Sequence, residues 1–285
     1  MTRRTDGGRA MLLVLLILLG AAQVAPCRDM QVHSSPGDTL SLLKTFIAVC
    51  QGYQRLPLQL DMDMRHSTNL MTSPDDTLSQ SAVFYLSSWG SCIRFGEVEQ
   101  LSTDSLMIIV SHRLKRIIIY RNTGSVESLL ARFVALPMKD SSLALLQQRY
   151  KVTVPDNSDD TARLVLQTRQ AIYGSRLPKD EIRVLYNKTT QMPWRVEQLH
   201  RSLVEMSPEA WKSFAGAPGW EDKLVRANDS TCFVIKELQT VYSYRHIAHE
   251  PGKKPPVSLA DRIIAEAPGR WRGVAGYEDY QIITP

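Results

Sequence analysis

The sequence lacks the motifs that most readily identify an enzyme. It contains no G-x-S-x-G nucleophile motif and no glycine-rich phosphate loop. Its four cysteines stand at wide, unrelated spacings and form neither a C-x-x-C pair nor a Cys/His zinc pattern. Long Lys/Arg blocks are also missing, and the net charge of +5 is mild, so nothing indicates nucleic acid. We therefore predict a protein that is not an enzyme and needs no cofactor, no metal and no nucleic-acid partner.

A long apolar run is missing as well. The longest, Met11–Leu19, is shorter than the roughly 20 residues that cross a bilayer. Three arginines precede this run and small residues follow it, which is the pattern of a secretory signal peptide. We expect cleavage after Ala22, which makes Gln23 the first residue of an exported chain.

The sequence leaves alternatives for the lipidation of Cys27 and for disulfide pairing among the other three cysteines. Val24–Cys27 resembles a bacterial lipobox, whose cysteine is acylated, although Pro26 stands where such boxes carry a small residue. The mature chain is therefore either free in the periplasm or medium, or anchored through Cys27. Export also permits a disulfide among Cys50, Cys92 and Cys232, such as Cys92 with Cys232, or thiols that stay unpaired.

The clearest structural signal of the mature chain lies near its N-terminus. A helix is predicted from Asp38, because Leu40, Leu43 and Ile47 recur at helical spacing. In Leu58–Arg65, apolar and polar residues then alternate over eight positions. This period predicts a strand with one buried face and one solvated face.

The rest of the chain is predicted to be mostly β-structure. Further strands are expected over residues 81–89, 92–101, 106–110, 117–120, 151–154, 163–169, 182–186 and 232–247. Residues 194–206 fit a strand or a helix, and we favour the strand. Helices are expected from residue 125, over 142–150, after the Ser207 N-cap and over Ile263 and Ile264. The fold class is α+β: a mostly antiparallel curved sheet covered by helices.

This pattern divides the chain into four parts. They are a signal peptide (1–22), an N-terminal segment (23–37), a half-barrel domain (38–250) and a C-terminal tail with a short helix (251–285). The stretch Gly252–Pro256 is the best candidate for an exposed joint.

Two groups of polar residues deserve comparison with known chemistry. Asp61 and Asp63 share one strand face about 7 Å apart, and paired carboxylates can hydrolyse sugars. Both, however, occupy the polar half of a regular alternation, where solvated residues belong. His246 and His249 are spaced three apart at a strand end, whereas zinc proteases need two histidines four apart on a helix. We favour a solvated strand face and an exposed strand end.

Apolar side chains give a stronger indication of function. Methionine and aromatic residues are spread over neighbouring strands, and such side chains adapt to flexible ligands. They either fill the core or leave a cavity for an apolar molecule. The residues predicted to line that cavity are Leu60, Met62, Met64, Phe84, Phe95 and Ile118.

The order of elements resembles a known family. A signal peptide, one amphipathic helix, a strand like Leu58–Arg65 and then a meander are similar to the LolA-like periplasmic outer-membrane lipoprotein carriers. The hairpin of Ser105–Val110 and Lys115–Tyr120 is similar to the central hairpin of that family. The resemblance covers roughly Asp38 to Leu203. The usual Asp-Gly turn of this hairpin is absent, and about 80 residues follow Leu203.

The resemblance implies an unclosed β-barrel with a helical lid that holds acyl chains. It places no functional residue of the family on this sequence. The expected function is an exported lipid- or lipoprotein-binding carrier of the bacterial envelope, with a lipid acyl chain or lipoprotein, and possibly a membrane surface, as partner. The alternatives are a structural or interaction protein of the envelope, or a hydrolase that uses Asp61 and Asp63.

Overall fold

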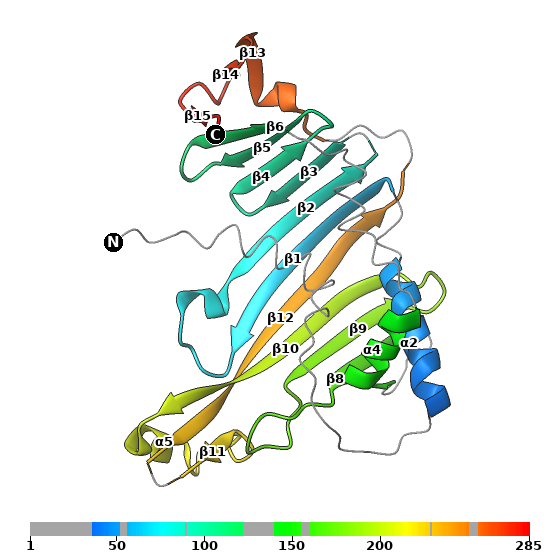
Figure 1. The fold of residues 1–285 in the computed structure, drawn as a ribbon, viewed down its shortest axis with the longest axis vertical. Coiled ribbons are helices and arrows are strands. Elements are labelled where there is room, and N and C mark those ends of the chain that lie inside the picture. The colour runs from blue at the N-terminus through cyan, green and yellow to red at the C-terminus, as the bar shows by residue number, and fades with distance from the viewer. Residues whose placement is uncertain are drawn as a thin grey trace.

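A sheet of thirteen strands forms the body of this computed structural model (Figure 1). The structure describes residues 36–51, 56–88, 90–121, 140–154, 160–228, 230–250 and 256–285. The predicted signal peptide, Cys27, the side chain of Cys50, the helix expected from residue 125 and most of the exposed joint lie outside this description. None of the described helices is both long and apolar enough to cross a membrane.

The first half of the chain is a helix followed by an antiparallel meander. In chain order its elements are α2 (Pro36–Gln51), β1 (Leu58–Thr68), the 3-10 helix η3 (Pro74–Thr77), β2 (Ser79–Ser87), β3 (Gly90–Phe95), β4 (Val98–Ser102), β5 (Leu106–Ser111) and β6 (Arg116–Arg121). The prediction of one strand over residues 92–101 is wrong. Gly96 adopts a φ of 56° and turns the chain there, so that β3 and β4 pair with each other.

The second half of the chain adds another set of strands, one of which pairs with β1 in the middle of the sheet. Its elements are α4 (Asp140–Arg149), β7 (Tyr150–Thr153), β8 (Thr161–Thr168), β9 (Asp180–Asn187), β10 (Pro193–Met206), α5 (Pro208–Phe214), β11 (Leu224–Arg226) and β12 (Cys232–Ala248). The strand favoured over residues 194–206 is confirmed as β10. Ser207 caps α5 as predicted, because its hydroxyl accepts a hydrogen bond from the Ala210 N–H.

The last elements follow β12. They are the 3-10 helix η4 (Leu259–Asp261), β13 (Ile263–Ala267), β14 (Arg270–Gly273) and β15 (Gln281–Ile283). The capping box predicted at Ser258 is present, since Asp261 accepts a hydrogen bond from the Ser258 N–H. The helix predicted over Ile263 and Ile264 is wrong, because these residues pair with β14 in a small hairpin.

The strands follow the order β15-β6-β5-β4-β3-β2-β1-β12-β10-β9-β8-β7, and β11 pairs with β12 beside this path. All described pairs in this sheet are antiparallel except β15 with β6. The two ends of the order do not pair, so the sheet is unclosed. The prediction of a mostly antiparallel, unclosed sheet is therefore confirmed. Helices α2 and α4 pack against each other and against β7 at one end (Figure 1).

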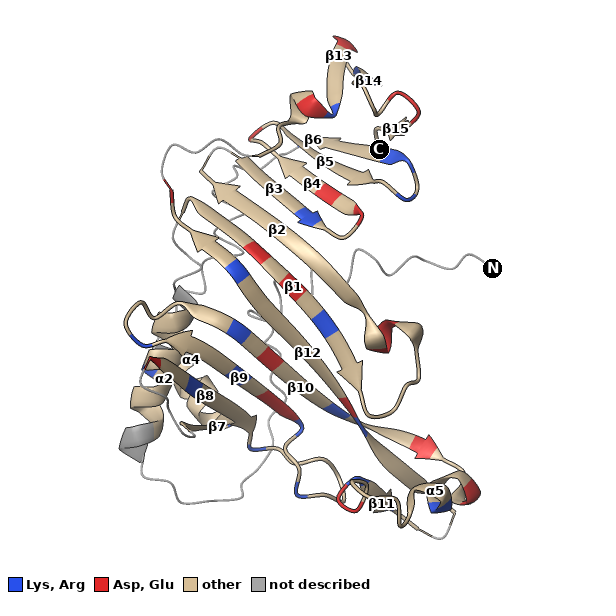
Figure 2. Ribbon diagram, turned by 180° about the vertical axis from the view of Figure 1, so that it is seen from behind, with Lys and Arg blue, Asp and Glu red and all other residues tan. Residues whose placement is uncertain are grey.

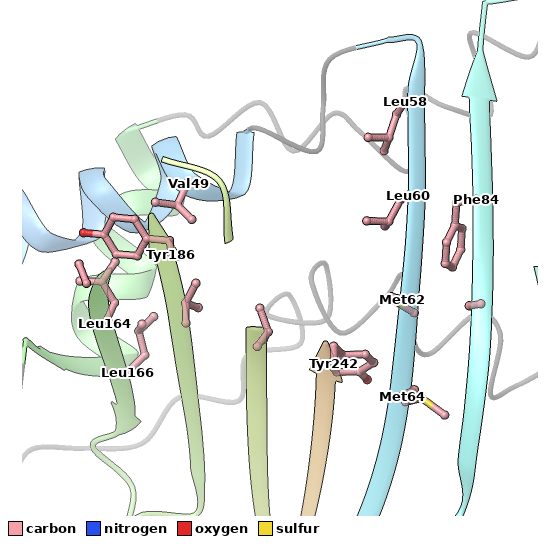
Figure 3. Close-up of a cluster of buried hydrophobic side chains, with 14 of the residues drawn as sticks. Val49, Leu58, Leu60, Met62, Met64, Phe84, Leu164, Leu166, Tyr186 and Tyr242 are labelled. Carbon is pink, nitrogen blue, oxygen red and sulfur yellow. The ribbon is translucent and has the colours of Figure 1, made fainter. Parts of the chain in front are cut away.

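The alternation in β1 separates two faces of the sheet. We call the face that carries Leu58, Leu60, Met62 and Met64 the inner face, and the opposite one the outer face. All four side chains are buried, while the intervening positions of β1 are partly exposed. The main core lies on the inner face, where Leu43, Val49 and Leu146 of the two helices join residues of eight strands (Figure 3).

A second core lies on the outer face of β2 to β6. It is formed by Tyr85, Cys92, Leu101, Ile108, Val110, Ile117 and Ile119, together with Ile263. Residues 256–285, here called the C-terminal segment, cover it with side chains that include Trp271, Tyr277 and Ile282. Cys92 belongs to this core, and both Cys92 and Cys232 are buried free thiols. The possible Cys92–Cys232 disulfide is therefore absent.

Candidate functional site

The inner face brings together the residues predicted to line a cavity. Leu60, Met62, Met64 and Phe84 are buried in the main core, between 2% and 8% exposed (Figure 3). Phe95 is half-buried and packs against this core. That these side chains line a cavity remains a prediction.

Strand register explains how distant residues meet on this face. One row crosses six adjacent strands from β1 to β6, and it consists of Leu60, Phe84, Ile93, Gln100, Ile109 and Ile118. Paired residues of antiparallel strands point to the same face, so Ile118 shares the inner face with Leu60. Three of the six predicted residues thus belong to one row.

Burial falls along this row. Leu60, Phe84 and Ile93 are buried, whereas Ile109 and Ile118 are half-buried. Met107 and Tyr120, their neighbours on β5 and β6, point to the same face and are half-buried too. The apolar surface of the inner face therefore extends from the main core onto β5 and β6.

Three tyrosines also point into the main core. Tyr150, Tyr186 and Tyr242 are 5% to 8% exposed, and burial raises the pKa of each. The pKa of Tyr242 reaches about 12. These side chains are therefore neutral at physiological pH, and each hydroxyl can donate one hydrogen bond and accept others.

The outer face of the central strands is charged rather than apolar. Figure 2 shows acidic and basic residues side by side along β1, β12, β10 and β9. Arg245 Nε lies 3.1 Å from Asp63, and Arg183 lies between Glu181 and Glu197. The exposed ion pair of Arg245 with Asp63 contributes little to stability, whereas the carboxylate of Glu181 is only 5% exposed.

This outer face contains both aspartates of the hydrolase hypothesis. The Ser81 hydroxyl donates a hydrogen bond of 2.6 Å to Asp63, which also pairs with Arg245 and is 44% exposed. Asp61 Oδ1 is buried and has no partner among the described residues. An open, ion-paired carboxylate lacks the enclosed setting of a catalytic acid, so the geometry does not favour hydrolysis.

The two candidate metal ligands at the end of β12 do not form a site. His249 Nδ1 lies 3.1 Å from the carbonyl oxygen of Pro57, and His246 is exposed. Within the described part of the chain, no group of three or more histidine, cysteine or acidic side chains is placed to hold a metal ion.

Sequence reasoning missed a buried polar cluster beneath the C-terminal segment. Glu99 of β4 accepts hydrogen bonds of 2.8 and 3.2 Å from Arg262, whose guanidinium also lies over the Tyr277 ring. His112 Nε2 lies 3.4 Å from Glu99, and its Nδ1 lies 3.0 Å from the Tyr280 hydroxyl. Burial raises the pKa of Glu99, but Arg262 and His112 lower it by more, so the net shift is downward. No local motif marks this cluster in the sequence.

No family model and no curated protein matches the chain. Three solved structures are similar: a DUF1329 family protein from Desulfovibrio piger, an outer membrane lipoprotein-sorting protein domain from Vibrio parahaemolyticus and a LolA superfamily protein from Nitrosomonas europaea. Their sequence identities are 12%, 10% and 10%, and their TM-scores are 0.28, 0.29 and 0.25.

These matches cover 76%, 77% and 76% of this chain and 95%, 95% and 94% of the respective structures. The chain is thus distantly similar to a set of solved structures that includes a LolA superfamily protein. Similarity at this level carries no argument about a ligand, so the site is assessed from its own residues.

Proposed function

We propose that this protein is an exported, non-enzymatic carrier that binds the acyl chain of a lipid or lipoprotein on its inner face. The observation that carries the proposal is the row from Leu60 to Ile118, apolar at every position except Gln100, which leaves the main core and continues half-buried onto β5 and β6. Each methylene moved from water onto such a surface contributes roughly 0.8 kcal/mol. A chain of a dozen methylenes can therefore bind without any specific polar contact.

The composition of this face suits a flexible ligand. Met62 and Met64 lie on the same face as Phe84, and methionine side chains adjust to ligands of irregular shape. Helices α2 and α4 pack on the same face at the β7 end. In our proposal they act as a partial lid, and the half-buried positions of β5 and β6 accept the part of the ligand that lies beyond them.

The proposal includes export to the bacterial envelope. Residues 1–22 act as a signal peptide, and the mature protein acts in the periplasm or outside the cell. Acylation at Cys27 would attach the same carrier to a membrane surface. In either case the ligand is transferred between partners without covalent chemistry.

A binding assay with matched variants tests this function. The neutral fluorescent probe N-phenyl-1-naphthylamine should bind the purified, delipidated protein, and native mass spectrometry should detect co-purifying lipid before delipidation. Ile118→Ala and Phe95→Ala should each weaken probe binding about three- to tenfold, because each removes apolar contact area from the inner face. Val83→Ala is the control, since Val83 is equally half-buried but lies on the outer face.

Two results would contradict the proposal. The first is a protein that binds no probe and carries no lipid, which would favour a structural or interaction role in the envelope. The second is an equal loss of probe binding in Val83→Ala, which would mean that the probe does not report on the inner face.

A further inference from the structure

A two-stranded arm leaves the sheet at the end opposite the C-terminal segment (Figure 1). The pairing of β1 with β12 ends at Thr68 and Leu238, and the pairing of β9 with β10 ends at Asp180 and His200. Beyond these residues β10 and β12 pair with each other over six further positions and, among the described strands, otherwise only with β11. Six residues of a strand extend about 20 Å. Helix α5, which follows β10, therefore lies at one end of the longest axis of the molecule (Figure 1).

The chain that closes this arm has an uncharged stretch. We call Ser213–Trp220 the tip; its eight residues lie between Lys212 and Glu221 and include no acidic or basic side chain. Gly216 and Gly219 have φ values of 94° and 84°, and no described atom lies within 4 Å of the position where a Cβ would stand at either. Five residues of the tip, including both glycines, are exposed. The tip is therefore an open, uncharged surface.

Two aromatic rings form the apolar part of the tip. The ring centroids of Phe214 and Trp220 lie 4.5 Å apart at an angle of 55°, and both side chains are half-buried. The indole N–H of Trp211 in α5 donates a hydrogen bond of 3.2 Å to the carbonyl oxygen of Phe233 in β12, which holds this helix on the arm. Tryptophan combines an apolar ring with one polar N–H, and it is enriched where membranes meet water.

The backbone of the tip is hydrogen-bonded within the arm. The N–H groups of Ala215, Ala217 and Trp220 donate to carbonyl oxygens three or four residues earlier. The Gly219 N–H donates a hydrogen bond of 3.0 Å to the carboxylate of Glu221. An unpaired N–H is costly to move out of water. The tip can meet lipid without breaking these bonds and without first ordering a flexible loop.

Charge and size indicate which partner fits the tip. Residues 205–226 carry four acidic and three basic side chains, so this end of the arm has no basic excess to attract anionic head groups. A stable protein interface takes about 20 to 30 residues from each partner, whereas the tip offers eight. A bilayer whose head groups have no net charge requires neither a basic patch nor a larger surface.

We infer that the tip is a membrane-docking site that inserts Phe214 and Trp220 into the head-group region of a zwitterionic phospholipid bilayer. This inference goes beyond the proposed function and does not depend on it, because the tip shares no residue with the apolar row of the inner face. A carrier and a structural protein of the envelope would meet the membrane in the same way.

Binding to vesicles tests the inference. The full mature chain from Gln23 is used with Cys27→Ser, so that acylation cannot supply the membrane contact. It should float with phosphatidylcholine vesicles, and its affinity should stay the same between about 0.05 and 0.5 M NaCl. Ala215→Glu should weaken binding about five- to twentyfold, because the added carboxylate loses hydration in the interface. Pro218→Glu, at a second exposed position of the tip, should have the same effect.

Matched variants separate the tip from other surfaces. Ala265→Glu adds the same charge at an exposed alanine of β13, at the other end of the molecule, and should leave binding unchanged (Figure 1). Ile118→Ala alters the inner face and should also leave it unchanged. Lipids brominated near the head group should quench tryptophan fluorescence of the bound protein. This quenching should fall in Trp220→Phe and stay the same in Trp271→Phe of β14.

Several results would overturn the inference. They are a wild type that does not bind phosphatidylcholine vesicles, equal effects of Ala215→Glu and Ala265→Glu, and binding that requires phosphatidylglycerol and disappears in high salt. A loss of vesicle binding in Ile118→Ala would place the lipid on the inner face instead. A wild-type dimer that Ala215→Glu dissociates, measured by sedimentation without vesicles, would make a second copy the partner of the tip. Vesicle binding without binding of N-phenyl-1-naphthylamine would overturn the carrier function alone.

Discussion

Arg262 donates two hydrogen bonds to the carboxylate of Glu99, a residue 163 positions earlier in the chain. The side chain of Glu99 is 5% exposed and that of Arg262 is 13% exposed, so this is a buried, bidentate ion pair. It joins the C-terminal segment to the outer face of β4. The segment thereby becomes part of the molecular core and covers the apolar side chains of β2 to β6.

Loss of this arginine should destabilise the protein strongly. Arg262→Met removes both hydrogen bonds of the guanidinium and leaves the buried Glu99 with His112 as its remaining neighbour, and such a change costs about 3 to 5 kcal/mol of unfolding free energy. Urea unfolding followed by tryptophan fluorescence measures it. Arg272→Met is the control, because Arg272 pairs with Glu266 at the surface and should contribute less than about 1 kcal/mol. Equal losses in the two variants would contradict the central role of Glu99.

The thiol of Cys92 should report whether the C-terminal segment opens locally. Burial raises the pKa of Cys92 to about 11, so alkylation should be slow in the folded protein. Arg262→Met should accelerate alkylation of Cys92 at least tenfold, measured by mass spectrometry of the peptide that contains it. Cys232, buried at the other end of the sheet, should be unaffected. Parallel acceleration at both cysteines would indicate global unfolding instead.

The ion pair of Asp76 with Lys236 should make stability depend on pH in the acid range. Burial raises the pKa of Asp76, but Lys236 and the N–H groups of Thr72 and Ser73 lower it by more, to about 2 from the usual 3.8. The folded pKa lies below the unfolded one, so this stabilisation is complete above about pH 4 and is lost as the pH falls toward 2.

Asp76→Asn should therefore lower the unfolding free energy by about 1 to 2 kcal/mol at pH 7. The difference in unfolding free energy between this variant and the wild type should shrink toward about pH 2.5. Urea unfolding at several pH values measures this. Asp75→Asn, a change at the exposed neighbouring carboxylate, should have a smaller effect. A difference for Asp76→Asn that stays constant with pH would show that the effect is not one of protonation.

The hairpin between β5 and β6 offers a test of backbone strain. Lys115 has a φ of 47°, and its side chain pairs with Asp279 of the C-terminal segment. Glycine adopts this conformation without strain, whereas a β-branched residue does not. Lys115→Gly should keep or raise the melting temperature, although it removes the ion pair, and Lys115→Val should lower it by about 2 to 4 °C. If Lys115→Gly lowered the melting temperature as much as Lys115→Val, the ion pair and not the backbone conformation would account for the stability at this position.

Export predicts a defined N-terminus. The mature protein should begin at Gln23, and Ala22→Leu should block processing because the signal peptidase requires a small residue at that position. Edman sequencing of the secreted chain tests this, with Ala25→Leu as the control that should be processed normally. A mature chain that begins at Cys27 and incorporates radioactive palmitate would instead show a lipid anchor.

The sequence predicts local structure well where the side-chain period is regular. The alternation from Leu58 to Arg65 identifies both β1 and the side chains that β1 buries. The prediction fails where one residue interrupts an otherwise regular stretch. Gly96 lies inside an apparently continuous strand, and its positive φ turns that strand into a hairpin. The sequence around Ile263 fits the start of a helix, but Ile263 pairs with Gly273 of β14 and therefore adopts an extended strand conformation.

The candidate site depends on contacts that no local pattern contains. Alternation places Leu60 on the inner face, yet its alignment with Phe84 and Ile118 follows from strand register. Tyr242 meets Met64 because β12 returns to the centre of the sheet. Such pairings are set by the whole topology, so the sequence could indicate an apolar face but could not identify which residues of distant strands meet on it.

The central position of β1 has a consequence for biogenesis. One edge of β1 pairs with β2, its close neighbour in sequence, but the other edge pairs with β12, where Glu237 N–H reaches Asn69 across 168 positions. During synthesis this second edge has no partner until β12, close to the end of the chain, has been made. Long-range pairing of this kind forms late. Until then the open edge of β1 can pair with a neighbouring nascent chain, which is the hazard of an unpaired strand edge.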